Sequence, residues 1–186
     1  MRAKENVNRK SGRLTSVAVF TALVAALTAC TSNTTNGSGF PKSANEDGHI
    51  PDPGISPYSQ HVAIRKMDPD LLAAVRKAAA GARAAGIELK VTSGWRSKAY
   101  QQRLLDEAVA KHGSLAEARR LVNTPEKSTH VTGKAVDIGP TDAADWVIRN
   151  GAEYGLCQTY ANEMWHFELA VAPGGECPVP HADASG

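Results

Sequence analysis

Two short stretches in the C-terminal half of the chain contain residue types that can hold and use a metal ion. STHVTGKAVD contains His130 and Asp137, and NEMWHFE contains Glu163 and His166. Two imidazole nitrogens and one carboxylate oxygen leave a fourth coordination position for water, as in catalytic zinc sites. Zinc lowers the pKa of its water to about 7, and Glu163 would act as the general base. We therefore expect His130, Asp137 and His166 to bind one Zn²⁺ ion.

The same ligand types also fit the two-histidine, one-carboxylate site of non-haem iron oxygenases. An export signal at the N-terminus, described below, would separate the protein from the cytosolic cosubstrates of those enzymes. Zinc is therefore the metal that we expect.

Three motifs resemble those of the VanY and VanX type zinc D-alanyl-D-alanine peptidases. Residues 128–137 match the pattern S-x-H-x-x-G-x-A-x-D, EMWH matches E-x-W-H, and SGWRS is similar to S-G-Y-R-S. The motifs occur in the order found in the family, and the similarity extends over roughly residues 67–169. The resemblance implies the same three zinc ligands, with Glu163 as catalytic base and Arg96 stabilising the oxyanion.

Substrate-binding residues are also implied by this resemblance. Ser128 and Gln101 correspond to residues that bind the terminal carboxylate of the substrate, although helical phase alone does not distinguish Gln101 from Gln102. Trp95 stands where the family usually has tyrosine, so the ring is kept and its hydroxyl is lost. We interpret Trp165, next to a predicted ligand, as a packing residue that orients His166.

The activity implied by the resemblance is hydrolysis of cell-wall peptides. We expect a D,D-carboxypeptidase that removes the terminal D-alanine from peptidoglycan stem peptides. The alternatives are an L,D-carboxypeptidase, a D,D-dipeptidase or a peptidoglycan endopeptidase of the same fold. A non-catalytic lipoprotein that binds the cell wall is a further alternative, which the presence of Glu163 and Arg96 disfavours. We expect a monomer.

The N-terminus has the pattern of a bacterial export signal. Five basic residues precede an apolar run from Leu14 to Leu27, and the sequence LTAC ends at Cys30. LTAC resembles a lipobox, so we expect residues 1–29 to be removed and Cys30 to be lipidated. An ordinary signal peptide with an incidental cysteine is the alternative. A lipid on Cys30 would anchor the protein to the bacterial membrane on its extracytoplasmic side.

Export also bears on the charge and the remaining cysteines. Removing residues 1–29 changes the formal net charge of +2 to about −2, so nothing in the mature chain argues for nucleic-acid binding. Outside the cytosol, Cys157 and Cys177 are expected to form a disulfide, with two free thiols as the alternative.

The composition predicts a flexible tether over residues 30–59, one compact domain over 60–178 and a tail over 179–186. Caps and periodicity predict helices that start at Asp68, Ser97, Ser114 and Thr141. Strands are expected over 87–93, around His130 to Asp137, over 157–160 and over 165–169. The mixture predicts an α+β fold with a small antiparallel sheet, similar to that of the D-alanyl-D-alanine peptidases.

Overall fold

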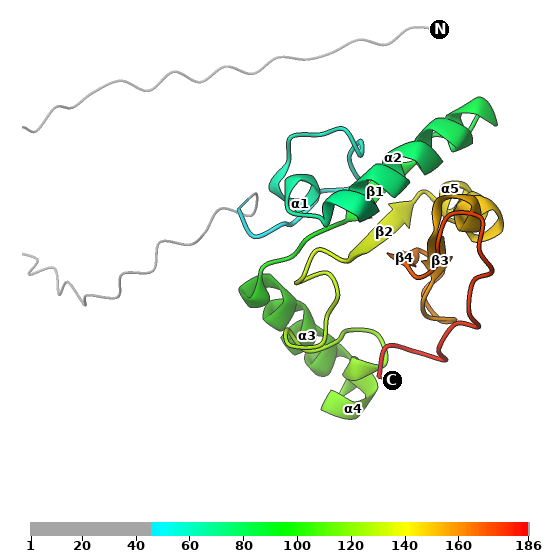
Figure 1. The fold of residues 1–186 in the computed structure, drawn as a ribbon. Coiled ribbons are helices and arrows are strands. Elements are labelled where there is room, and N and C mark those ends of the chain that lie inside the picture. The colour runs from blue at the N-terminus through cyan, green and yellow to red at the C-terminus, as the bar shows by residue number, and fades with distance from the viewer. Residues whose placement is uncertain (1–45, 186) are drawn as a thin grey trace, which may run out of the picture. The chain divides into compact units, whose positions relative to one another are not determined.

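The computed structural model describes residues 46–185 (Figure 1). The predicted signal peptide, Cys30 and most of the predicted tether lie outside these residues. The helices are α1 (Val62–Arg65), α2 (Pro69–Ala84), α3 (Lys98–His112), α4 (Leu115–Arg119), α5 (Thr141–Asn150) and the 3₁₀ helix η1 (Gly151–Tyr154). The strands are β1 (Lys90–Ser93), β2 (Ala135–Gly139), β3 (Leu156–Gln158) and β4 (His166–Leu169).

The four strands form one antiparallel sheet in the order β1-β2-β4-β3, which confirms the predicted α+β class. Val136 on β2 faces Phe167 on β4, and both side chains belong to the main apolar core. That core joins the sheet to α2 and α5. Because side chains alternate along a strand, the neighbours of these core residues, Asp137 and His166, lie on the opposite face of the sheet.

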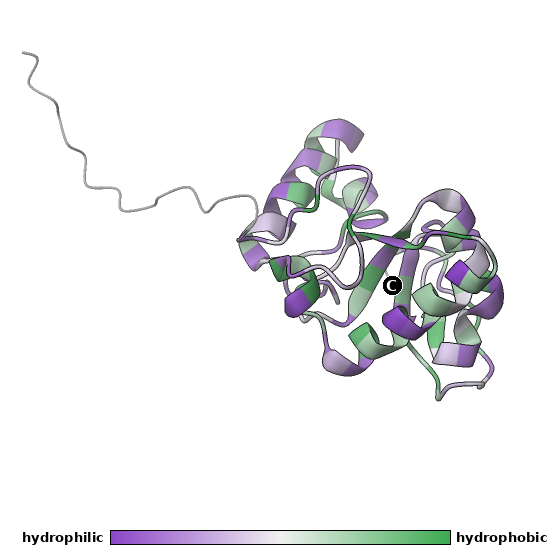
Figure 2. Cartoon of the chain, turned by 90° about the horizontal axis from the view of Figure 1, so that it is seen from above, coloured by the Kyte–Doolittle hydropathy of each residue, from purple (hydrophilic) through white to green (hydrophobic). Residues whose placement is uncertain are grey.

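A second, smaller apolar cluster lies between α3 and α4, around Leu105, Ala108 and Ala118. Figure 2 shows apolar and polar residues interleaved along the helices, as expected for helices that cover a core on one side. Within residues 46–185, none of the helices combines the length and apolar character needed to cross a membrane.

Local sequence signals locate most of the elements. Asp68 and Ser97 cap α2 and α3 through their side chains, as predicted. Thr141 was expected to cap α5, but it is the first helical residue and Pro140 occupies the cap position without a side-chain hydrogen bond. The strand expected over 87–93 begins only at Lys90, and α1, capped by His61, was not predicted.

The predicted tether and tail are both partly wrong, because segments assigned to them pack on the domain. Asp47 is 2% exposed and pairs with Arg103 on α3, and Ile55 forms a bridge with Val91 on β1. The folded domain therefore includes Asp47 and Ile55, which lie well before residue 60. At the other end, Ala184, which was assigned to the tail, is buried, with 6% of its surface exposed. Long-range packing of this kind leaves no periodic signal in a short segment rich in Gly and Pro.

Candidate metal centre and active site

The sheet brings two of the predicted ligands together. Asp137 on β2 and His166 on β4 are direct cross-strand partners on the face that points away from the main core. Directly opposed residues in an antiparallel pair have their Cβ atoms about 4.5–5.5 Å apart, close enough to share one ion. The strand pairing alone therefore places a carboxylate beside an imidazole.

His130 comes from a turn that precedes β2, so the prediction that it lies on a strand is wrong. The turn is shaped by Gly133, whose φ of +76° favours glycine. A Cβ atom at Gly133 would lie 2.5 Å from the carbonyl oxygen of Lys66, so only glycine fits against that backbone. The close packing holds the turn over the sheet and directs His130 toward the other two ligands.

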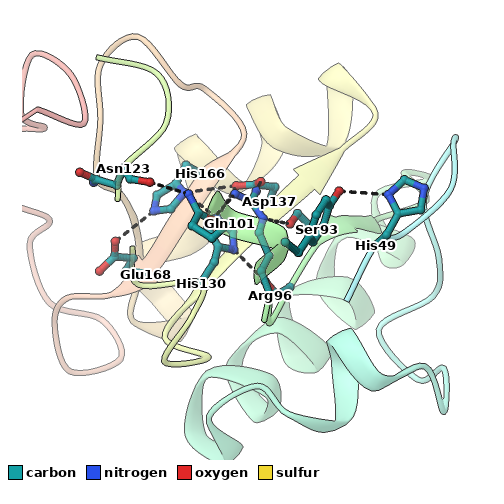
Figure 3. Close-up of polar contacts among 11 residues, drawn as sticks. His49, Ser93, Arg96, Gln101, Asn123, His130, Asp137, His166 and Glu168 are labelled. Atoms are coloured by element: carbon teal, nitrogen blue, oxygen red, sulfur yellow. Dashed lines mark hydrogen bonds and ion pairs between the residues drawn. The ribbon is translucent and has the colours of Figure 1, made fainter. Parts of the chain in front are cut away.

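The three predicted ligands converge in the manner that a tetrahedral metal ion requires (Figure 3). His130 Nε2 lies 3.2 Å from His166 Nδ1, and each of these nitrogens lies 3.2 Å from Asp137 Oδ1. Tetrahedral zinc with bonds of about 2.0–2.1 Å separates its ligand atoms by roughly 3.3 Å. All three side chains are buried, which limits competition from water.

In each histidine, the ring nitrogen that points away from the other ligands (the outer nitrogen) fixes the tautomer, and so decides whether the nitrogen facing the other ligands (the inner nitrogen) carries a proton. His130 Nδ1 lies 2.8 Å from the carbonyl oxygen of Gly94, and His166 Nε2 lies 3.0 Å from Glu168 Oε1. A carbonyl and a carboxylate can only accept, so both outer nitrogens must donate. In the neutral rings the two inner nitrogens then present lone pairs to each other and to Asp137. A cation between them removes this repulsion, so the residues fit Zn²⁺.

The pKa values in the metal-free protein reflect the same geometry. Burial opposes ionisation of Asp137, but His130, His166 and Arg96 outweigh it and hold the pKa well below its usual value. Burial alone would lower the pKa of His166, but its hydrogen bonds to Asp137 and Glu168 raise that pKa to about 9. Burial and the charge of Arg96 lower the pKa of His130. In the metal-free protein, a proton on His166 thus supplies the positive charge that balances the carboxylate of Asp137.

Glu163 lies in the same pocket as the three ligands. It is 7% exposed, and its Oε1 atom is buried without a hydrogen-bond partner among the described residues. Burial raises the pKa of Glu163 to about 7, with His166 lowering it and Asp137 raising it by smaller amounts. A carboxylate with a free oxygen and a pKa near neutrality is suited to accept a proton from water. The location of Glu163 beside the three ligands is therefore consistent with the predicted role of Glu163 as general base.

Arg96 is fixed by three acceptors around the site. Its Nε donates to Ser93 Oγ (2.7 Å), Nη1 to Gln101 Oε1 (3.1 Å) and Nη2 to Asp137 Oδ2 (2.8 Å). A guanidinium has five N–H donors, so two remain for a substrate after these contacts. The group is therefore held rigidly next to the metal ligand, as an oxyanion-stabilising residue should be.

Gln101 lines the pocket, but most of its amide is already engaged. It is 1% exposed, accepts from Arg96 and donates from Nε2 to the carbonyl oxygen of Asn123, 2.8 Å away. We predicted that Gln101 binds the substrate carboxylate; the structure gives it the additional role of positioning Arg96. It also separates Gln101 from Gln102, which is exposed and pairs with Asp106.

The remaining predicted substrate residues lie in different surroundings. Ser128 is buried in the lining of the pocket, as expected. Trp95 is not among the lining residues, and its ring is instead covered by Lys66, whose Nζ lies 3.9 Å from the ring centre. Trp165 was interpreted as a packing residue, but it lines the pocket and is 44% exposed. Trp165 therefore forms part of the exposed wall of the pocket.

Glu168 is the site residue that the sequence reasoning missed. Its Oε1 accepts from His166 Nε2 and also from Thr129 Oγ1, 2.9 Å away. Glu168 is two residues after His166, and the alternation of β4 places both on the same face. It lies on the far side of the imidazole from the metal position, so it is a hydrogen-bond partner of a ligand and the carboxylate ligand is Asp137.

The fold and these motifs agree with comparisons to known proteins. The family model of VanY, D-alanyl-D-alanine carboxypeptidase, matches residues 64–172. A D-alanyl-D-alanine carboxypeptidase of Enterococcus faecalis is 31% identical over 111 residues, covering 46% of this chain and 41% of that relative. The chain thus belongs to the VanY family, and it spans less than half the length of this curated relative.

Two solved structures have the same fold. The D,D-pentapeptidase VanY from a VanB-type resistance cassette, solved with Zn(II), has a TM-score of 0.53 and 26% identity, covering 56% of this chain and 73% of that one. The L,D-carboxypeptidase LdcB has a TM-score of 0.52 and 27% identity, covering 66% of this chain and 67% of that one. Proteins with this fold therefore include both a D,D-pentapeptidase and an L,D-carboxypeptidase.

Proposed function

We propose that this protein is a zinc-dependent D,D-carboxypeptidase that removes the terminal D-alanine from peptidoglycan stem peptides. The observation that carries the proposal is the equilateral arrangement of three ligand atoms, 3.2 Å apart, in one pocket with Glu163, whose Oε1 has no hydrogen-bond partner among residues 46–185. Membership of the VanY family supports the substrate class.

The roles of the chain's own residues follow from their positions. His130, Asp137 and His166 would hold the zinc ion, which when bound activates water and polarises a carbonyl group. Glu163 takes a proton from the attacking water and delivers it to the leaving amine. Arg96 offers its two remaining N–H groups to the oxygen on which negative charge develops. Ser128 would bind the terminal carboxylate of the peptide.

A defined set of stem peptides tests the reaction. The soluble domain, incubated with tripeptide, tetrapeptide and pentapeptide stems, should release D-alanine from the pentapeptide, and a chelator should abolish the release. Glu163→Ala should keep zinc and lose activity, with the exposed Glu176→Ala as control. Full activity of Glu163→Ala would contradict the assignment of the base.

An L,D-carboxypeptidase is the second candidate, favoured by the similarity to LdcB. In that case the tetrapeptide stem, and not the pentapeptide, would be the peptide that loses its last residue. The same incubation therefore distinguishes the two activities, and release of a dipeptide would indicate a D,D-dipeptidase. Cleavage of a cross-linked stem dimer, added as a fourth substrate, would indicate an endopeptidase.

We further propose that the protein is anchored to the bacterial membrane, outside the cytoplasm, through a lipid on Cys30. The proposal rests on the LTAC sequence after the apolar run, which lies outside the described residues. Cys30→Ser should abolish incorporation of labelled palmitate and leave the protein unanchored. Unchanged labelling and mobility in the presence of globomycin would contradict lipidation.

A further inference from the structure

The last described residues, 181–185, form a segment that crosses one side of the pocket and that we call the C-terminal strap. In Figure 1 the red end of the chain runs from the region of β3 to a point beside α4. The disulfide between Cys157 and Cys177 ties the chain to β3 shortly before the strap begins.

The strap is held at both of its ends by hydrogen bonds. His181 pairs with the loop between β3 and β4: its N–H donates to the carbonyl oxygen of Thr159 (2.9 Å), and its own carbonyl accepts from Ala161 N (2.8 Å). At the far end, Ala184 N donates to the carbonyl oxygen of Arg120 (3.2 Å). The side chains of Asp183 and Arg120 form an ion pair with a separation of 2.9 Å.

These contacts also join the strap to the loop that carries the catalytic base. Asn162, directly before Glu163, donates from Nδ2 to the same carbonyl oxygen of Arg120, at 3.0 Å. The end of α4, the base-bearing loop and the strap therefore meet at one residue. The strap is thus a fixed part of the site in this structure.

Ala184 is the strap residue that reaches the pocket. It is 6% exposed and lines the pocket, whereas Ala182, two residues earlier, is exposed and lines no pocket described. Leu104, Leu121 and Val122 line the same pocket. The lining therefore combines polar side chains, those of the metal ligands and Glu163, with apolar ones, Ala184 among them.

We propose that the C-terminal strap is a specificity wall, in which the side chain at position 184 borders the bound peptide and sets how much room the pocket leaves for it. The inference rests on the proposed function, because it takes the pocket to be the peptide site. Ala184 contributes only a methyl group to the lining, so a larger side chain at position 184 would take room from the pocket.

Two matched substitutions test the wall. Ala184→Phe places a ring at a position that lines the pocket, and Ala182→Phe adds the same ring to an exposed position of the same strap. We expect Ala184→Phe to raise KM for the pentapeptide stem, and the Kd for D-alanyl-D-alanine in calorimetry of the zinc-loaded protein, by about tenfold or more. We expect Ala182→Phe to stay within about twofold of the wild type. Zinc content and Tm are measured for every variant.

The outcomes separate the wall from the proposed function. If the wild type hydrolyses no stem peptide, the proposed function fails, while dipeptide binding still reports on the wall. If the wild type is active and Ala184→Phe behaves like Ala182→Phe, the wall is overturned and the proposed function stands. Should Ala184→Phe fail to fold, Ala184→Val decides, because it adds only two methyl groups: a raised Kd or KM supports the wall, and unchanged values overturn it.

Discussion

At the scale of single residues, the site depends on hydrogen-bond acceptors that lie behind the ligands. Gly94 and Glu168 each accept from the outer nitrogen of a histidine, so the inner nitrogens face the metal as lone-pair donors. The carboxylate of Glu168 also raises the electron density of the ring of His166. Such partners orient a ligand and strengthen its bond to the metal.

Replacing Glu168 should weaken zinc binding without removing a ligand. We expect Glu168→Ala to lower zinc affinity by about 10–100-fold, measured by competition with a chromogenic chelator. Glu168→Gln should lose less, because its amide oxygen can still accept from His166 Nε2. Glu176→Ala, at an exposed position, is the control. An affinity of Glu168→Ala equal to that of the control would show that the hydrogen bond does not support the ligand.

Glu163 should make the metal-free protein less stable as the pH rises. Its pKa is about 7 in the folded protein and 4.5 in its ordinary state, so the folded state holds its proton more tightly. The contribution of this proton to stability is complete below pH 4.5 and is lost as the pH rises through about 7. Glu163→Gln lacks the titration, so it should gain about 2 kcal/mol over the wild type between pH 4.5 and 8.

Urea unfolding in the presence of chelator measures this difference. Glu176→Gln, which changes an exposed carboxylate, should show the same pH dependence as the wild type. A free-energy difference between Glu163→Gln and the wild type that does not change with pH would mean that Glu163 is ordinarily acidic in the folded protein.

At the scale of elements, segments from distant parts of the chain support the loop that carries Arg96. The carbonyl oxygen of Asp47 accepts from Ser97 N at 2.8 Å, and its carboxylate pairs with Arg103 on α3. We call residues 46–55 the arm. A Cβ atom at Gly48 would lie 2.1 Å from the carbonyl oxygen of Trp95, so the arm packs tightly on the same loop. The arm belongs to the folded domain.

Asp47→Ala should destabilise the domain by about 1 kcal/mol, because the substitution removes the buried carboxylate that accepts hydrogen bonds from Arg103 and from His49 N. Chemical denaturation of the zinc-loaded protein measures the change. Asp52→Ala, in the same arm but exposed, should change stability by less than about 0.5 kcal/mol. Equal effects of the two substitutions would indicate that the arm does not contribute to folding.

The elements themselves were largely predictable from local signals. The caps at Asp68 and Ser97 and the alternation in β2 and β4 are recorded in short stretches of sequence, and the helices and strands were found near their expected places. The turn that carries His130 was not predicted, because the β-branched residues around it, Thr129, Val131 and Thr132, are typical of a strand. The burial of Asp47 and Ala184 was missed because both depend on partners more than 50 residues away.

At the scale of the whole molecule, the disulfide closes the second half of the site. Cys157 and Cys177 were expected to pair after export and do so in the structure, and the bridged segment contains both Glu163 and His166. The ligand pair Asp137 and His166 is held independently by the pairing of β2 with β4. The bridge should therefore contribute stability more than chemistry.

Removing the bridge with Cys157→Ser and Cys177→Ser should lower the free energy of unfolding by about 3 kcal/mol, from the chain entropy of the 20-residue loop. We expect kcat at 25 °C to stay within about threefold of the wild type, with zinc still bound. Denaturation and steady-state kinetics check the two quantities separately. Loss of turnover in a folded, zinc-loaded double variant would assign the disulfide a role in the chemistry.

The sequence by itself determined which residue types could act and which motif each belongs to: two histidines, one aspartate and one glutamate at characteristic spacings, behind a predicted export signal. It could do so because ligand chemistry and strand alternation are local properties. Only the tertiary structure decided how the donors are oriented: which nitrogen of each histidine faces inward, that Gln101 holds Arg96, that Glu168 supports His166, and that Ala184 reaches the pocket. These contacts join segments that are far apart in the chain, and their geometry depends on packing that no short window of sequence contains.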